Sequence, residues 1–148
     1  MIVEVLKEIF TRDLNRLYHE IDLYKSEDAL WKIQGHISNA AGNLCLHLIG
    51  NLNTYIGREI GHIGYVRNRE LEFSATNVPK TILLQMVNAT IEVVNTSLSK
   101  IDDHVLPTEY PVLVFDEKKS IGFLLIHLST HLTYHLGQIN YHRRMTDY

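Results

Sequence analysis

Hydrophobic residues recur every three or four positions along several long stretches of the chain, and this spacing is typical of amphipathic α-helices. The pattern predicts helices over about residues 2–24, 40–60 and 79–100, and a last helix that begins at Lys118 or Ser120 and runs to about residue 144. The segments between them, residues 25–37, 62–77 and 102–117, lack this period and are predicted as connections. They are much longer than the usual median of about 4 to 6 residues, so the chain can cross over between helices. The pattern predicts an all-α four-helix bundle with long crossover connections, in one domain over residues 1–148.

Some features interrupt this pattern. The short apolar run from Val112 to Phe115 has strand-like residues but no second run to pair with, so it is predicted to be part of a connection that packs on the bundle. Gly42, Gly50 and Gly57 lie inside the second predicted helix. Each weakens helix formation by roughly 1 kcal/mol relative to alanine, which indicates close packing or ligand approach at these positions.

Composition narrows the class of protein. Of 148 residues, 45% are hydrophobic and 21% charged, which is ordinary for a soluble globular domain. The net charge of −3 and the lack of a basic run argue against nucleic-acid binding. The single cysteine, Cys45, excludes an internal disulfide and fits a reducing compartment. No signal peptide or bilayer-spanning run is apparent, so we expect a cytoplasmic protein without a membrane partner.

The last predicted helix carries three histidines at four-residue steps, His127, His131 and His135, within an apolar pattern. Because an α-helix turns 100° per residue, His131 and His135 project from one face about a turn apart. Burying imidazole costs free energy unless its nitrogens find partners. A divalent metal satisfies this need by taking the lone pairs of neutral imidazoles. The spacing therefore predicts that His131 and His135 bind one metal ion.

A third ligand must come from another helix, since protein zinc sites usually have at least three protein ligands. The second predicted helix offers His47, with Asn43 and Asn51 about one turn to either side. We therefore predict a site of His47, His131 and His135, although His47 alone also fits a hydrogen-bonded core histidine. Cys45 lies about 200° around the helix from His47 and is predicted to be a core residue.

The other histidines have weaker signals. His127 lies about 80° from His135 around its helix, so it is predicted to support the site or to be a hydrogen-bonded core residue. The remaining ones are expected at the surface: His19, His36, His62, His104 and His142.

Several other chemistries are excluded. The spacing of His131 and His135 matches the metalloprotease motif HExxH, but Leu132 replaces its glutamate base. There is no G-x-S-x-G nucleophile context and no glycine-rich phosphate loop. No carboxylate is apparent among the predicted ligands, so no catalytic residue is assigned.

Two motifs resemble a known family. The stretches NLCLHLIGNLNTYIG (residues 43–57) and HLSTHLTYHLGQINYHRR (residues 127–144) are similar to the DinB/YfiT-like superfamily, and most of all to an uncharacterised bacterial branch of it. The resemblance implies a four-helix bundle with a three-histidine metal site, whose ligands fall on His47, His131 and His135. It also implies no DNA binding, and a homodimer is expected because relatives often form dimers. From the ligand chemistry, zinc or nickel is the expected metal, while iron and manganese also tolerate imidazole ligands.

Some members of this superfamily are S-transferases or isomerases that use bacillithiol, mycothiol or a similar thiol, with the metal activating the thiol. By this resemblance, the chain is expected to be a metal-dependent thiol S-transferase that acts on a small molecule. Asn43, Asn51, Tyr134 and Gln138 are then candidates to orient ligands or substrate. Two alternatives stay open: a hydrolase in which the metal activates water, and a metal-stabilised dimer that binds a small molecule without turnover.

Overall fold

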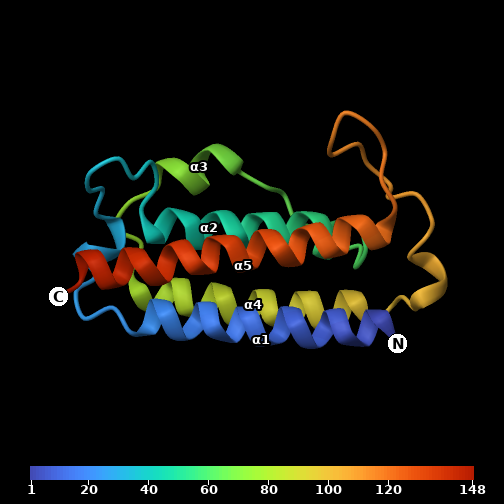
Figure 1. The fold of residues 1–148 in the computed structure, drawn as a ribbon, viewed down its shortest axis with the longest axis horizontal. Helices are drawn as coiled ribbons and strands as arrows, with labels where there is room; N and C mark the ends of the chain where they lie inside the picture. Colours follow the sequence, from blue (N-terminus) through green and yellow to red (C-terminus); the bar gives the residue numbers. More distant parts are fainter.

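The computed structural model describes residues 1–148 and is all-helical. Its α-helices are α1 (Ile2–Asp22), α2 (Ala41–Leu52), α3 (Arg69–Ser74), α4 (Lys80–Leu98) and α5 (Ile121–Thr146). Figure 1 shows that α1, α2, α4 and α5 run lengthwise beside one another, while the short α3 lies on the outer side of α2. Helix α1 packs against α4 and α5, and α2 packs against the same two helices. The predicted all-α class is confirmed, and the arrangement is a helical bundle.

The three- and four-residue spacing of apolar side chains explains this packing. It places one stripe of each long helix in a continuous core of 31 buried residues. Burying a large aliphatic or aromatic side chain contributes about 1.5–3 kcal/mol each, so this core is the main source of stability. The stripe of α1 illustrates the pattern: Val3, Leu6, Phe10, Leu14, Leu17 and Ile21 are all buried.

Helix α2 differs from the others because every one of its residues is buried. Its outer side is covered by α3, and its inner side by α4 and α5. The predicted single helix over residues 40–60 is divided: α2 ends at Leu52 and continues as a π-helical turn, Asn53–Arg58. Since α2 has little contact with water, a polar side chain on it is stabilised by a partner within the protein.

The connection predicted over residues 62–77 was wrong in part, because it contains α3. Asn68 begins this helix, and its side-chain oxygen accepts a hydrogen bond from the Leu71 backbone N–H at 3.1 Å. A helix of this length is too short for apolar periodicity to reveal it. The side chain of Asn43 holds α3 against α2, since its Nδ2 donates to the carbonyls of Glu72 at 3.1 Å and Ala75 at 2.8 Å.

The other connections agree with the sequence pattern. Val112, Val114 and Phe115 pack against the core, and the segment forms no strand. Gly42 permits close packing, since a Cβ there would lie 2.7 Å from the ring of Trp31. None of the helices combines the length and the apolar character needed to cross a bilayer.

The expectation that His142 lies at the surface was wrong, since only 4% of the residue is exposed. Its Nε2–H donates to the Lys32 carbonyl at 2.8 Å, and its Nδ1 lies 2.7 Å from the Tyr24 hydroxyl, which donates to it. His142 follows the core residue Ile139 by three positions, so it continues the buried stripe of α5. The ring joins the end of α5 to the segments that follow α1.

Asp13 links α1 to α5 and is fully buried. It accepts hydrogen bonds from Arg12 Nε at 2.8 Å, from Arg16 Nη1 at 3.3 Å and, across the helix interface, from Thr133 Oγ1 at 2.8 Å. Burial by itself would raise the pKa of Asp13, but the hydrogen bonds from Arg12 and Thr133 and the two positive charges lower it below its ordinary value.

Because the pKa of Asp13 is lowered in the folded state, its contribution to the free energy of unfolding should depend on pH. Replacing Asp13 with Asn should lower the free energy of unfolding at pH 7 by roughly 1.5–3 kcal/mol, because hydrogen bonds to an ionised group are lost. The contribution is fully present above the unfolded pKa of about 3.9 and disappears as the pH falls through the folded value. Urea denaturation of both proteins at pH 7, 5, 4 and 3 measures it. The exposed Asp28, changed to Asn, is the control; equal losses at pH 7 and pH 3 would contradict the assignment.

Candidate metal centre

Three imidazoles converge between α2 and α5. His47 comes from α2, and His131 and His135 come from consecutive turns of α5. One nitrogen of each ring lies within 4.8 Å of the others. Nε2 of His47 and Nε2 of His131 are 3.2 Å apart. The structure thus brings together the three residues that the sequence pattern selected.

This arrangement fits a divalent transition metal. Zinc–nitrogen bonds are about 2.0–2.1 Å long, so two imidazole nitrogens on one tetrahedral ion lie about 3.3 Å apart. The separation of 3.2 Å between His47 and His131 is close to this value. His131 Nδ1 is buried without a hydrogen-bond partner, and it is Nε2 of this ring that faces His47. Imidazole ligands suit zinc, nickel, copper and iron alike.

Burial and neighbouring groups favour the uncharged form of His47 and His131. Burial is the main cause that lowers the pKa of His131, and the neighbouring His135, His47 and His127 add to it, so that the pKa falls to about 4. Burial also lowers the pKa of His47, although the hydrogen bond to Glu72 opposes this shift. At neutral pH both rings are therefore uncharged, which is the form that binds metal.

The sequence pattern did not reveal Glu72, a carboxylate directly behind His47. Only 6% of Glu72 is exposed, and its Oε1 lies 3.1 Å from His47 Nδ1. Arg67 donates to both carboxylate oxygens, from Nε to Oε2 and from Nη2 to Oε1, at 2.9 Å each. Gly50 makes room for this group, because a Cβ at that position would lie 1.8 Å from Glu72 Oε2. The interior glycine was the one sequence signal for this approach.

The predicted supporting residues take different places. Gln138 accepts a hydrogen bond from His135 Nδ1 at 2.7 Å and so orients this ring. Asn43 bonds to the backbone of α3 and not to a histidine. Asn51 is buried, and its side-chain oxygen has no hydrogen-bond partner.

Two further side chains lie on the exposed side of α5. His127 is outside the group that can share an ion. Its ring is stacked 6.2 Å from that of His131 and packs edge-on against Phe115 at 5.0 Å. Tyr134 is 65% exposed, with its ring 5.4 Å from that of His135.

Cys45 is fully buried, and burial raises the pKa of its thiol to about 12. It is a core residue, as predicted, and cannot serve as a nucleophile.

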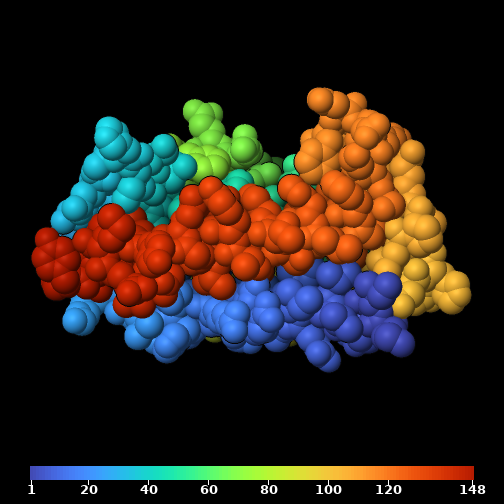
Figure 2. Space-filling model, in the orientation of Figure 1, coloured from blue at the N-terminus to red at the C-terminus, as the bar shows by residue number.

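A cleft of about 570 Å³ opens beside His135. Its walls are the C-terminal half of α5, with Tyr134 and Tyr141, and the segment of residues 36–39. Figure 2 shows this segment, in cyan, standing against the red end of α5. No Lys, Arg, Asp or Glu lines the cleft. It can therefore take an uncharged small molecule with an apolar or aromatic part next to the histidines.

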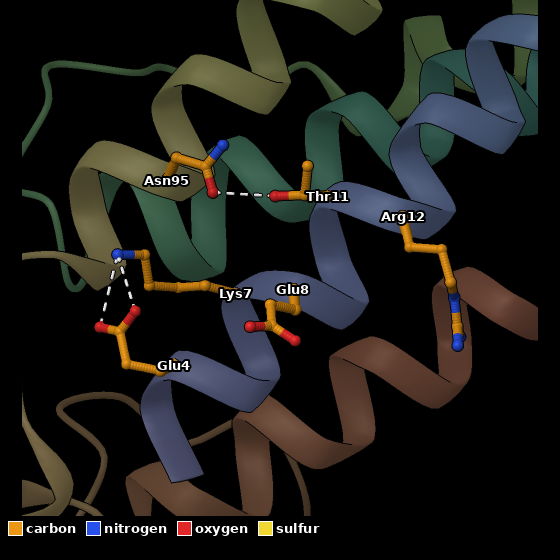
Figure 3. Close-up of a pocket in the computed structure, with 6 residues that line it drawn as sticks. All are labelled: Glu4, Lys7, Glu8, Thr11, Arg12 and Asn95. Atoms are coloured by element: carbon orange, nitrogen blue, oxygen red, sulfur yellow. Dashed lines mark hydrogen bonds and ion pairs between the residues drawn. The ribbon is translucent and has the colours of Figure 1, made fainter. Parts of the chain in front are cut away.

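A second depression lies between α1 and α4, away from the histidines (Figure 3). No hydrophobic residue lines it, and its side chains bond to one another: Thr11 donates to Asn95 at 3.0 Å, and Lys7 pairs with Glu4 at 3.5 Å. It carries no group arranged for chemistry.

The approach of Glu72 to Gly50 predicts different effects for the same substitution at two helix-interior glycines. Gly50→Ala should displace the carboxylate from Arg67 and His47 and lower the free energy of unfolding by roughly 1–3 kcal/mol. Gly137→Ala should raise it by roughly 0.5–1 kcal/mol, because nothing lies within 4 Å of its Cβ and helix propensity improves. Urea denaturation compares them. Equal effects of the two substitutions would show that Glu72 is not held against α2.

Comparison with known proteins places the chain in a family. A search of curated proteins found no match. A family model described as "Protein of unknown function (DUF1572)" matches residues 3–147, nearly the whole chain. The chain therefore belongs to the DUF1572 family.

Proposed function

We propose that this protein is a DinB-like four-helix bundle, built from α1, α2, α4 and α5, that acts as a metal-dependent thiol S-transferase. His47, His131 and His135 hold one divalent ion, zinc or nickel. The co-substrate is a low-molecular-weight thiol of the bacillithiol or mycothiol type. The predicted homodimer and cytoplasmic location stay predictions.

The observation that carries this proposal is the convergence of three imidazoles beside a cleft that lacks acidic groups. A bound divalent ion stabilises thiolate at neutral pH and thus supplies a nucleophile that Cys45 cannot provide. Hydrolysis would also be helped by a carboxylate base near the substrate. Glu72 is the carboxylate nearest to the ligands, but it is held behind His47 by Arg67 and does not line the cleft. Thiol transfer needs no such base, so it is favoured over the hydrolase.

In the proposed reaction, the thiol sulfur forms a bond to an electrophilic carbon of the second substrate. The leaving group departs with the electron pair of the bond that breaks, and the thiol proton passes to solvent. The chain's own residues bind the electrophile and orient the metal ligands. Tyr134 and Tyr141 offer aromatic surfaces for the apolar part of the electrophile, and Gln138 fixes the ring of His135.

Metal content tests the site itself. Elemental analysis of untagged protein should find about one equivalent of transition metal in the wild type and little in His47→Ala or His131→Ala, because each variant removes a ligand. Both variants should stay helical by circular dichroism, since the core of 31 residues does not include the histidines. His127→Ala is the control and should keep its metal. Wild-type stoichiometry in His131→Ala would refute the site.

Activity tests the reaction. Metal-loaded protein should accelerate thioether formation between bacillithiol or mycothiol and an uncharged aryl halide such as 1-chloro-2,4-dinitrobenzene, followed by absorbance. The acceleration should disappear in His131→Ala and on metal removal. Ester hydrolysis without thiol would favour the hydrolase instead. Metal binding with neither activity would leave the third alternative, a binding protein without turnover.

A further inference from the structure

Two groups compete for one nitrogen of His47. Nδ1 lies 3.1 Å from Glu72 Oε1 and 3.4 Å from Arg67 Nη2. A carboxylate oxygen can only accept a hydrogen bond, whereas a guanidinium nitrogen can only donate one. Glu72 therefore requires a proton on His47 Nδ1, while Arg67 would require a lone pair there. The ring cannot satisfy both, so the neighbour that prevails determines which nitrogen of neutral His47 carries the proton.

The geometry favours Glu72. Arg67 already directs Nε and Nη2 at the carboxylate, at 2.9 Å each, so its contact with His47 is the longest of the group. A lone pair on Nδ1 would also face a carboxylate lone pair at 3.1 Å, which is repulsive and is poorly screened in a buried site. The proton therefore lies on Nδ1, and the lone pair lies on Nε2.

This lone pair points to the other ligands, since His47 Nε2 is 3.2 Å from His131 Nε2. We propose that Glu72, clamped by Arg67, is the positioning residue of the metal centre: it holds His47 as the tautomer whose Nε2 is free to bind metal. This inference rests on the proposed three-histidine site and adds the group that prepares it. Glu72 acts through His47 and does not touch the ion.

Several features of the chain hold Glu72 in place. Gly50 leaves the space that the carboxylate occupies, and Asn43 fixes the α3 backbone at Glu72 and Ala75. The side chain of Arg67 is only 12% exposed, so its bonds to Glu72 are sheltered from water. Ring rotation and proton exchange at His47 are therefore restricted before any ion arrives. A histidine prepared in this way binds metal more tightly than one with no partner behind it.

The tautomer can be measured without metal. Long-range ¹H–¹⁵N correlation spectra of metal-free wild-type protein at pH 7.5 should show His47 protonated at Nδ1, with its signals assigned by their loss in His47→Gln. In Glu72→Ala, the carboxylate acceptor is removed and the Arg67 Nη2 donor is the group that remains near His47 Nδ1, at 3.4 Å. The proton should then move to Nε2. An Nε2-protonated His47 in the wild type would overturn the proposal.

Zinc affinity measures the consequence. Competition with a chromophoric chelator should show that Glu72→Ala weakens zinc binding about 10- to 100-fold, the usual effect of losing such a partner. Glu70→Ala is the matched control, because it removes the same charge from an exposed position of α3. Unchanged affinity in Glu72→Ala, or an equal loss in Glu70→Ala, would overturn the proposal.

The two proposals can fail separately. If wild-type protein binds no zinc, the metal site fails, while the spectrum of the metal-free protein still decides whether Glu72 sets the tautomer. If wild-type protein binds zinc and Glu72→Ala binds it equally well, the site stands and the role of Glu72 fails. Circular dichroism of each variant confirms that the helices are retained.

Discussion

The complete burial of α2 is the constraint on which the rest of this structure depends. A helix with no exposed face cannot leave a polar side chain to water, so a polar atom there that finds no partner in another element costs free energy. Asn43 finds the backbone of α3, and His47 finds Glu72 on one side and the histidines of α5 on the other. The requirement to satisfy these groups explains why α3 lies over α2, although it adds little to the apolar core.

The same constraint explains the division of roles among the charged groups. The one buried carboxylate at the centre is turned away from the cleft and neutralised by Arg67. The open side, by contrast, is lined by neutral groups. The predicted ligands thus have the ion pair of Glu72 and Arg67 on one side and an uncharged, partly aromatic surface on the other. This asymmetry suits chemistry in which the nucleophile is brought by a small molecule rather than provided by a side chain.

The features that could be predicted from the sequence are those that depend on the spacing of residues within one helix. The long helices followed from apolar spacing, and His131 and His135 followed from the four-residue step on one helix. His47 was found because its helix is otherwise apolar. Helix α3 could not be found this way, since its length is below two turns and most of its residues are exposed.

Glu72 and His142 were missed for another reason. Their roles depend on contacts with residues distant in the chain: Glu72 with His47, and His142 with Tyr24 and Lys32. Nothing near Glu72 in the sequence signals such a partner, and the three-residue step from Ile139 to His142 indicates burial but not what the ring contacts. The interior glycine at position 50 showed that something approaches α2, but not what.

His47 and His131 are separated by 84 positions in the chain, yet they face each other across one helix interface. Neither helix alone offers the complete set of ligands, and the set exists only while α2 and α5 are packed in register. An ion bound there would therefore report tertiary rather than secondary structure. A compact state that kept its helices but lost its side-chain packing would release the ion, which makes occupancy of the site a measure of the fully ordered native fold.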